Sequence, residues 1–331
     1  LQLSAYASAL FVGLAGVLLL SGASQGSSLS GVVSSLNEIR TIAYPIIGAV
    51  GALLLTGTAA VVARRLDKPA VAVLANCAPV LLACSIAGAL PAGPWTAYGA
   101  LAAGVALTVG ALSSLVLPGR LRASGLAPAI IGVSLGLFGL LSGTLGIQPE
   151  RISALLAALL LLACLSIPWL AMASTPVRVT GPSAAAQIDP RQIDKSVSMG
   201  VSMSVSIRLG TCLALVILAP ILCSTSQGIV LSALIGAALM LSTRSIRSRV
   251  EVLIGVLSGM AVLAWAAYAA ALQSATSLLL VLVTSLTGSL LVLATNVVTP
   301  KTRPWLSRTA DTISTLVIIA VPPFALYMWG M

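Results

Sequence analysis

Histidine is absent from this 331-residue sequence, and acidic residues number only seven. Without histidine the chain holds no His-based metal site, no Ser-His-Asp triad and no histidine proton relay. Seven carboxylates are too few for the acid-rich metal sites of phosphoryl chemistry. We therefore expect a protein that is not an enzyme, with no catalytic residue, no metal and no cofactor.

Charged residues of both signs are scarce as well. A soluble globular domain carries about 25% charged residues, whereas this sequence carries 7% and is 59% hydrophobic. So little polar surface cannot cover a protein in water. The composition predicts an all-α integral membrane protein, with residues 1–331 forming a single polytopic domain.

The cysteines and the positive charge add no chemistry to this picture. All five cysteines lie inside apolar runs without Cys-x-x-Cys spacing, which favours a packing role. The formal net charge is +10, but the basic residues form short clusters between apolar runs. A nucleic-acid interface needs Lys and Arg gathered with aromatic residues on a solvated face. We therefore expect no binding of nucleic acid.

About eleven segments are long and apolar enough to cross a bilayer, whose core of ~30 Å needs about 20 residues per helix. Two neighbouring segments are short, and the break between them carries no charge. The segments are 3–20, 42–63, 69–90, 96–117, 126–146, 152–174, 209–225, 228–243, 250–272, 276–298 and 310–330.

The basic residues indicate that the short segments 209–225 and 228–243 are separate spans. With a cytoplasmic N-terminus, fifteen of the 17 Lys and Arg residues fall in cytoplasmic loops. Only Arg40 and Arg151 fall outside, each within two residues of a glutamate. Merging the short pair would turn the last two basic clusters outward, against the positive-inside rule. The sequence therefore predicts a cytoplasmic N-terminus and a C-terminus outside.

The predicted loop over residues 175–208 contains a signal for the start of a helix. Asp189 and Pro190 are typical of an N-cap followed by the first helical residue. Apolar residues then follow at four-residue spacing, which predicts a cytoplasmic helix running into the span 209–225. These residues are Ile193, Val197, Val201 and Val205.

The predicted spans carry no Asp, Glu, Lys or Arg near their middle. Ion-coupled transporters and membrane enzymes that process lipid phosphates need such residues, so both classes are disfavoured. Small residues are abundant instead, with Gly-x-x-x-Gly motifs that begin at Gly132, Gly139 and Gly255. These motifs allow close helix approach, either within one bundle or between two protomers.

Two stretches of the sequence resemble one family. Leu239-Met240-Leu241-Ser242-Thr243-Arg244-Ser245-Ile246-Arg247 resembles a basic turn in EccD, a membrane subunit of actinobacterial type VII (ESX) secretion systems. The final span, from Arg308-Thr309-Ala310-Asp311 through Val321-Pro322 to Tyr327, resembles the closing helix of that family. One departure is Ser314, where many members carry a second acid one turn after the aspartate.

The resemblance implies a non-catalytic structural component of the type VII secretion inner-membrane complex, which supports protein export. Members of the family are multi-pass proteins of the cell inner (plasma) membrane. They dimerise around lipid and assemble with EccB, EccC and EccE, of which EccC supplies the ATPase. The resemblance also implies a small ubiquitin-like cytosolic domain before residue 1. The residues alone leave open an alternative, a secondary transporter or permease for a neutral small molecule.

The candidate contact residues lie at the predicted cytoplasmic ends. They would meet either partner subunits or anionic lipid headgroups, which attract each basic residue by about 1 kcal/mol. Asp311 and Arg308 have i,i+3 spacing, so a local ion pair competes with a partner contact at that end. The candidates are Arg191, Lys195, Arg244, Arg247, Arg249, Arg308 and Asp311.

Overall fold

The computed structural model describes residues 46–61 apart from 47 and 60, and then 69–89, 97–116, 119–174, 190–243, 248–273 and 303–329. Over these residues the regular elements are all helices, as the composition predicts. The predicted spans 3–20 and 276–298 lie outside the described residues.

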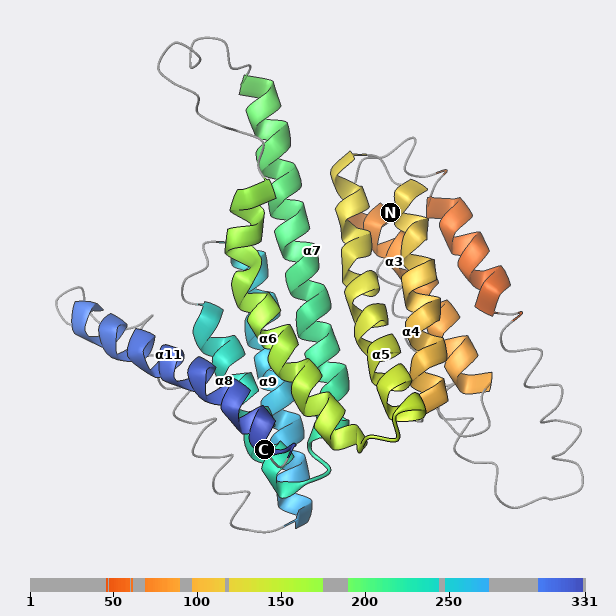
Figure 1. The fold of residues 1–331 in the computed structure, drawn as a ribbon. Helices are drawn as coiled ribbons and strands as arrows, with labels where there is room; N and C mark the ends of the chain where they lie inside the picture. The colour runs from red at the N-terminus through yellow and green to blue at the C-terminus, as the bar shows by residue number, and fades with distance from the viewer. Residues whose placement is uncertain are drawn as a thin grey trace, which may run out of the picture. The chain divides into compact units, whose positions relative to one another are not determined.

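Figure 1 shows the described helices and labels most of them in their order along the chain. A short apolar helix over Gly48–Ala59 comes first. The named elements are α3 (Pro69–Ala89), α4 (Ala97–Ala111), the 3-10 helices η1 (Leu112–Val116) and η2 (Gly119–Gly125), α5 (Leu126–Thr144), α6 (Pro149–Ser174), α7 (Pro190–Leu222), α8 (Ser226–Ser242), α9 (Arg249–Gln273) and α11 (Arg303–Tyr327).

Four of the described helices are long and apolar enough to cross a membrane, namely Arg122–Thr144, Pro149–Ile167, Val197–Leu222 and Arg249–Leu272. Shorter apolar helices, among them Ala97–Ala111 and Ser226–Ser242, accompany them. The structure thus has the helical membrane character expected from the sequence. The number of eleven spans and the sidedness of the termini stay predictions.

The described helices fall into two compact units. Unit 1 takes its residues from 1–145 and 168–210, and unit 2 from 146–167 and 211–331. The long helices α6 and α7 therefore each contribute one part to unit 1 and one part to unit 2.

In unit 1, α4 and α5 lie side by side and their backbones touch through glycines (Figure 1). A Cβ at Gly132 would lie 2.7 Å from the Gly104 carbonyl oxygen, and one at Gly104 would lie 2.6 Å from the Gly132 carbonyl oxygen. A Cβ at Gly139 would lie 2.5 Å from the carbonyl oxygen of Ala97. The motifs that begin at Gly132 and Gly139 thus serve packing within the chain. The sequence alone left open whether they pack within one bundle or between two protomers.

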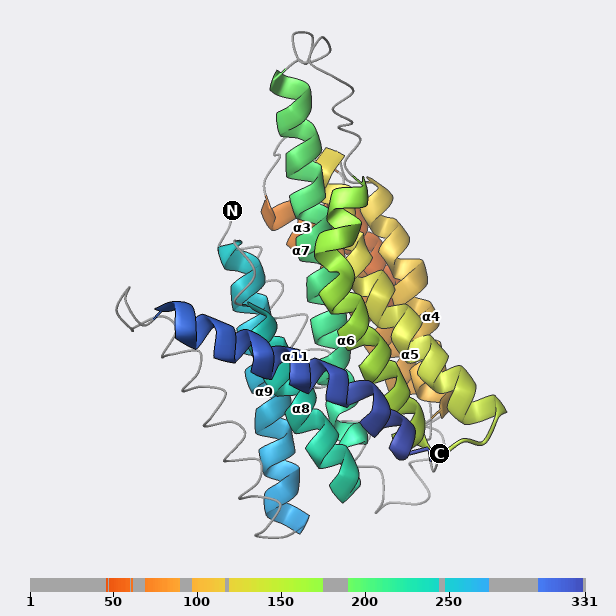
Figure 2. The same cartoon turned by 60° about the vertical axis from the view of Figure 1, so that its left-hand side comes forward.

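In unit 2, glycines likewise allow the backbones of α8 and α9 to approach closely. A Cβ at Gly236 would lie 3.1 Å from the carbonyl oxygen of Gly259, and one at Gly259 would lie 3.0 Å from that of Gly236. Met240 and Leu263 fill the adjacent space within a buried apolar cluster. The helix α11 packs against α8, which it crosses in Figure 2.

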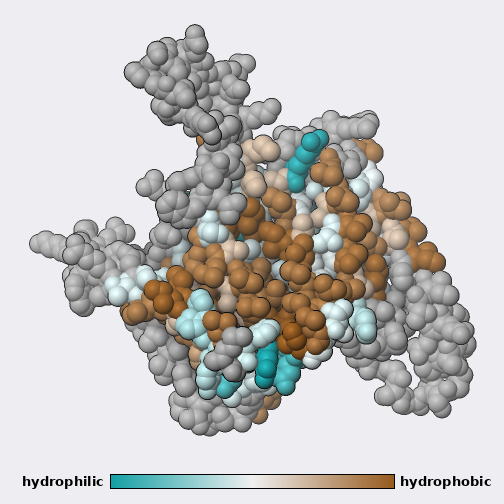
Figure 3. Space-filling model, viewed as in Figure 1, coloured by the Kyte–Doolittle hydropathy of each residue, from teal (hydrophilic) through white to brown (hydrophobic). Residues whose placement is uncertain are grey.

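Apolar side chains also cover the outside of the helices. Among the described residues, brown hydrophobic atoms predominate on the face drawn in Figure 3. Leu137 and Leu140 of α5 and Leu253 and Leu257 of α9 are among the large exposed hydrophobic residues. A water-soluble monomer rarely exposes so much contiguous apolar surface, so these faces suit contact with lipid or with protein.

Candidate interaction surfaces

The helix α7 begins at Pro190, as the Asp-Pro signal predicts, and runs without interruption to Leu222. In unit 1, a Cβ at Gly210 would lie 2.8 Å from the carbonyl oxygen of Ala127, the second residue of α5. This contact places residues 190–209 beyond the start of α5 (Figure 1). At about 1.5 Å per residue, that segment is roughly 30 Å long. We call residues 190–209 the stalk.

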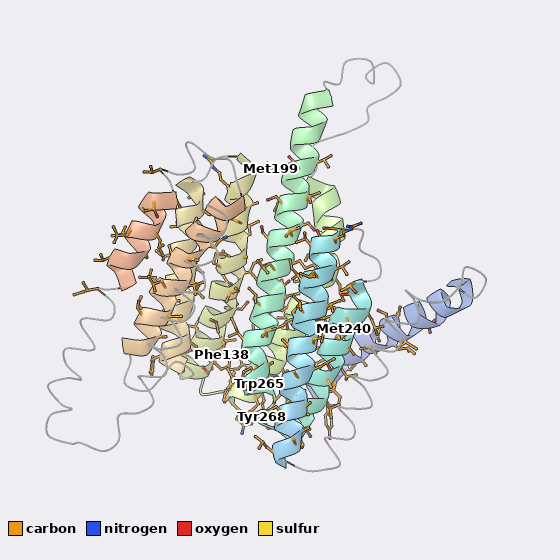
Figure 4. All side chains as sticks on the ribbon, turned by 180° about the vertical axis from the view of Figure 1, so that it is seen from behind. Phe138, Met199, Met240, Trp265 and Tyr268 are labelled. Atoms are coloured by element: carbon orange, nitrogen blue, oxygen red, sulfur yellow. The ribbon has the colours of Figure 1, made fainter. Side chains whose placement is uncertain are left out.

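The stalk exposes apolar side chains although it extends past its neighbour α5. Val197, Met199 and Val201 are 50%, 54% and 50% exposed. Figure 4 shows Met199 on this part of α7. Arg191 and Lys195 lie in its first two turns. Val197 and Val201 are four residues apart and share one face of the helix, whereas Met199 lies on the opposite face. The face of Val197 and Val201 is suited to binding a helix or groove of another protein.

The cluster of three arginines before α9 is only partly described. Arg249 is the first residue of α9 and is exposed, whereas Arg244 and Arg247 lie outside the described residues. Glu251, in the first turn of the same helix, is only 9% exposed. A carboxylate is favoured there because the helix macrodipole places positive charge at the N-terminus.

The surroundings of Arg308 and Asp311 differ from the expectation for the final span. The helix α11 begins at Arg303 rather than near residue 310, so Asp311 lies more than two turns into the helix. Stabilisation by the macrodipole fades beyond the first turn and does not apply to this acid. Both residues lie on one continuous helix, so the i,i+3 spacing needed for a local pair is present.

Sequence reasoning missed one buried cation. Arg208 lies within α7 and is only 3% exposed, whereas the sequence interpretation treated it as the last basic residue of a cytoplasmic loop. Its position directly before the uncharged segment 209–243 gave no indication of burial, because hydropathy along the chain does not report which residues pack around a side chain. A buried arginine is costly to desolvate and is usually kept for a structural or functional reason.

The turn between α7 and α8 separates two helices at the break that the sequence predicts. Thr225 caps α8 by accepting a hydrogen bond from the backbone N–H of Gly228 at 3.1 Å. A Cβ at Gly228 would collide with the carbonyl oxygen of Leu222. Only glycine fits this close approach, so the turn depends on that residue.

Two helix ends of unit 2 lie close to this turn. The Ser224 hydroxyl has two acceptors in reach of its one proton, the Ile221 carbonyl oxygen at 2.8 Å and Oε1 of Glu150 at 3.3 Å. The Trp329 indole N–H donates to the backbone carbonyl of Arg151 at 2.9 Å. The start of α6, the α7–α8 turn and the end of α11 therefore lie at one end of unit 2. The predicted topology puts all three on the same side of the membrane.

Trp329→Phe is expected to destabilise this end of unit 2. The change removes the indole N–H and leaves the Arg151 carbonyl without that donor, at a cost of about 1 kcal/mol. The thermal unfolding temperature of the purified protein should fall by a few degrees. Trp265→Phe is the matched control, because Trp265 is 42% exposed and its ring lies 5.7 Å from that of Tyr268. Equal shifts in the two variants would contradict the proposed importance of the Trp329 hydrogen bond.

Comparison with solved structures finds chains of similar fold. The chain is similar to protomer 1 of the ESX-3 core complex, with a TM-score of 0.66 and 16% identity over 99% of this chain and 72% of that one. It is also similar to a chain of an ESX-5 inner membrane complex free of MycP5, in State II, with a TM-score of 0.55 and 21% identity over 85% and 67% of the two chains. At these identities the likeness concerns the fold. A search of curated proteins gave no match.

The family assignment rests on the sequence itself. A model described as the EccD-like transmembrane domain matches residues 2–331. This match includes the two stretches that carry the resemblance, around residues 239–247 and 308–327, and it confirms that resemblance. The chain therefore belongs to the family of EccD-like transmembrane domains.

Proposed function

We propose that this protein is a non-catalytic structural component of a type VII secretion inner-membrane complex and supports protein export through the cell inner membrane. The observation that carries the proposal is the family match over residues 2–331. The similarity in fold to chains from ESX-3 and ESX-5 complexes supports it. Helices packed through close glycine contacts suit a scaffold.

The proposed partners are EccB, EccC and EccE, together with membrane lipids. The stalk supports a partner contact because it exposes Val197, Met199 and Val201 beyond the start of α5. The basic candidates at the stalk start, Arg191 and Lys195, would add attraction to an acidic partner or to anionic headgroups.

We also propose that the chain forms a dimer with lipid between the protomers. The glycine contacts of α4–α5 and α8–α9 are already used within the chain. Contacts between protomers would then involve larger exposed side chains, such as Leu253, Leu257 and Met260 of α9. Long side chains on separate helices leave gaps that acyl chains can fill, which supports a lipid-containing interface.

The proposed topology has eleven spans, with the N-terminus in the cytoplasm and the C-terminus outside. Two independent observations support it. Fifteen of the 17 basic residues fall on the cytoplasmic side in this arrangement. The hydrogen bonds of Trp329 and Ser224 bring together the start of α6, the α7–α8 turn and the end of α11. The same arrangement assigns all three segments to the outside.

The experiment that tests the function is affinity purification of the chain from native membranes in mild detergent, followed by mass spectrometry. A scaffold should co-purify with several subunits, including the ATPase subunit, in one large complex. A chain recovered alone or as a small oligomer, and active in transport of a neutral solute after reconstitution, would favour a permease instead.

The triple variant Arg244→Gln, Arg247→Gln, Arg249→Gln is expected to reduce recovery of partners several-fold and to lower expression much less. The basic residues attract anionic headgroups by about 1 kcal/mol each, so some loss of membrane insertion is expected as well. The ratio of co-purified subunits to chain, measured by quantitative mass spectrometry, separates the two effects. The double variant Arg120→Gln, Arg122→Gln is the control, because it removes basic residues from a different predicted cytoplasmic loop. A falling chain level with an unchanged subunit ratio would show that the three arginines serve insertion only.

A further inference from the structure

The chain passes between unit 1 and unit 2 three times. The crossings fall between Leu145 and Gly146, between Ile167 and Pro168, and between Gly210 and Thr211. A glycine or a proline stands at each of them. These two residue types are the ones that most change the stiffness of a backbone.

Gly146 lies in the short connection between α5 and α6, which end and begin at Thr144 and Pro149. Its φ of +61° lies in the left-handed region that glycine adopts without cost. Among the described residues, no atom lies within 4 Å of the place that a Cβ would take. A side chain at this position would therefore meet open space.

Pro168 lies in the interior of the 26-residue helix α6. Proline has no backbone N–H, so it cannot donate the hydrogen bond that a helical residue makes to the carbonyl four positions earlier. Sharp bends in helices occur mainly at prolines, at Gly/Ser pairs and at bulges. The part of α6 before Pro168 belongs to unit 2 and the part that starts with Pro168 belongs to unit 1.

Gly210 lies inside the 33-residue helix α7. Its close approach to Ala127 fixes it to α5, and Thr211, the next residue, belongs to unit 2. Glycine lowers helix stability by roughly 1 kcal/mol relative to alanine. The last residue of α7 that belongs to unit 1 is therefore one with low helix propensity.

We propose that unit 1 and unit 2 move as two rigid bodies, with α6 bending at Pro168, α7 bending at Gly210 and Gly146 acting as a loose third connection. Such hinges, in which a few residues absorb the backbone change, are a common basis of domain motion. The stalk belongs to unit 1, whereas the end held by Trp329 belongs to unit 2. A partner that displaces the stalk would thereby turn unit 1 against unit 2. The hinge goes beyond the proposed scaffold function. Only the step in which a partner displaces the stalk rests on that function.

The test uses electron–electron resonance distances in the complex purified from membranes. Nitroxide labels are placed at exposed positions after the native cysteines are replaced by alanine, with unlabelled chain co-expressed in excess. The pairs Tyr98–Leu115 and Gln227–Val250 report on unit 1 and on unit 2 separately. The pairs Tyr98–Gln227 and Leu115–Val250 report between the units. If the cysteine-free chain does not assemble, the same positions receive a keto amino acid for labelling, with the cysteines kept.

The pairs between units should give distance distributions at least twofold wider than the pairs within units. Pro168→Ala restores the missing N–H and should narrow the inter-unit distributions by a similar factor, while the intra-unit distances stay unchanged. Pro220→Ala is the matched control, because Pro220 lies inside α7 away from the crossings. Equal widths for all four pairs, or equal effects of the two proline variants, would overturn the proposal.

Discussion

Gly132→Leu is expected to push α4 and α5 apart and to reduce the recovery of folded protein roughly tenfold or more. Even a Cβ at this position would lie 2.7 Å from the Gly104 carbonyl oxygen and 2.7 Å from the Thr108 backbone nitrogen. These obstacles belong to the backbone, so a rotamer change in a neighbour cannot relieve them. Overpacking typically costs 1–3 kcal/mol, and a rigid backbone leaves little relaxation to reduce that cost.

The measurement is the amount of monodisperse protein after detergent extraction, together with its thermal unfolding temperature. Gly57→Leu is the matched control, because no described atom lies within 4 Å of a Cβ at Gly57 and the residue is exposed. It should leave both readouts close to those of the unaltered protein. Comparable losses in the two variants would mean that any leucine at a helical glycine is harmful, and that the α4–α5 contact is not the cause.

The combined change Val197→Gln, Val201→Gln is expected to reduce the recovery of partner subunits by roughly thirtyfold while the chain stays folded. Both side chains lie on one face of the stalk and are about half exposed, so covering the rest of each apolar surface contributes roughly 1 kcal/mol to binding. Two such contributions correspond to a roughly thirtyfold change in affinity. Glutamine forms helices well, so the stalk should stay helical.

Quantitative mass spectrometry of the purified complex measures this effect, and thermal unfolding checks that the chain is intact. The control is Val197→Leu, Val201→Leu, which keeps this face apolar. Partners should be recovered with this control and lost with the glutamine variant. Full recovery with glutamine at both positions would show that this apolar face of the stalk does not bind the complex.

Hydropathy along the chain predicted the described helices well where an apolar run ends at a strong signal. The helices α3, α5 and α9 begin within a residue of the predicted segments. Pro190 marks the start of α7, and the uncharged break near Ser224 separates α7 from α8. Proline, glycine and capping residues act locally, so their effect is visible in the sequence.

Boundaries without such signals were less accurate. The helix α4 ends at Ala111 and continues as 3-10 turns, although the apolar run extends to residue 117. The helix α11 starts at Arg303, because polar and charged residues can continue a helix before it becomes apolar. A threshold on hydropathy cannot detect either change, since it measures composition and not backbone hydrogen bonds.

Tertiary relations could not be predicted from the sequence. The Gly-x-x-x-Gly motif at Gly132 indicates that some backbone approaches closely, but only the structure identifies Gly104 of α4. The burial of Arg208 depends on the helices around it, which a linear pattern does not encode. Among the candidate contact residues, Arg249 is the one whose exposure is described, and their roles stay predictions.

The turn at Thr225 and Gly228 also bears on how the protein enters the membrane. Residues 209–243 contain no charged side chain, whereas Arg208 and Arg244 stand at either end. The short turn joins the last part of α7 to α8, so the translocon can receive both as one hairpin and move no charge across the bilayer. The two flanking arginines then stay on the side from which the hairpin entered. In the predicted topology, a charge placed in the turn, as in Gln227→Lys, would have to be carried across the bilayer during biogenesis.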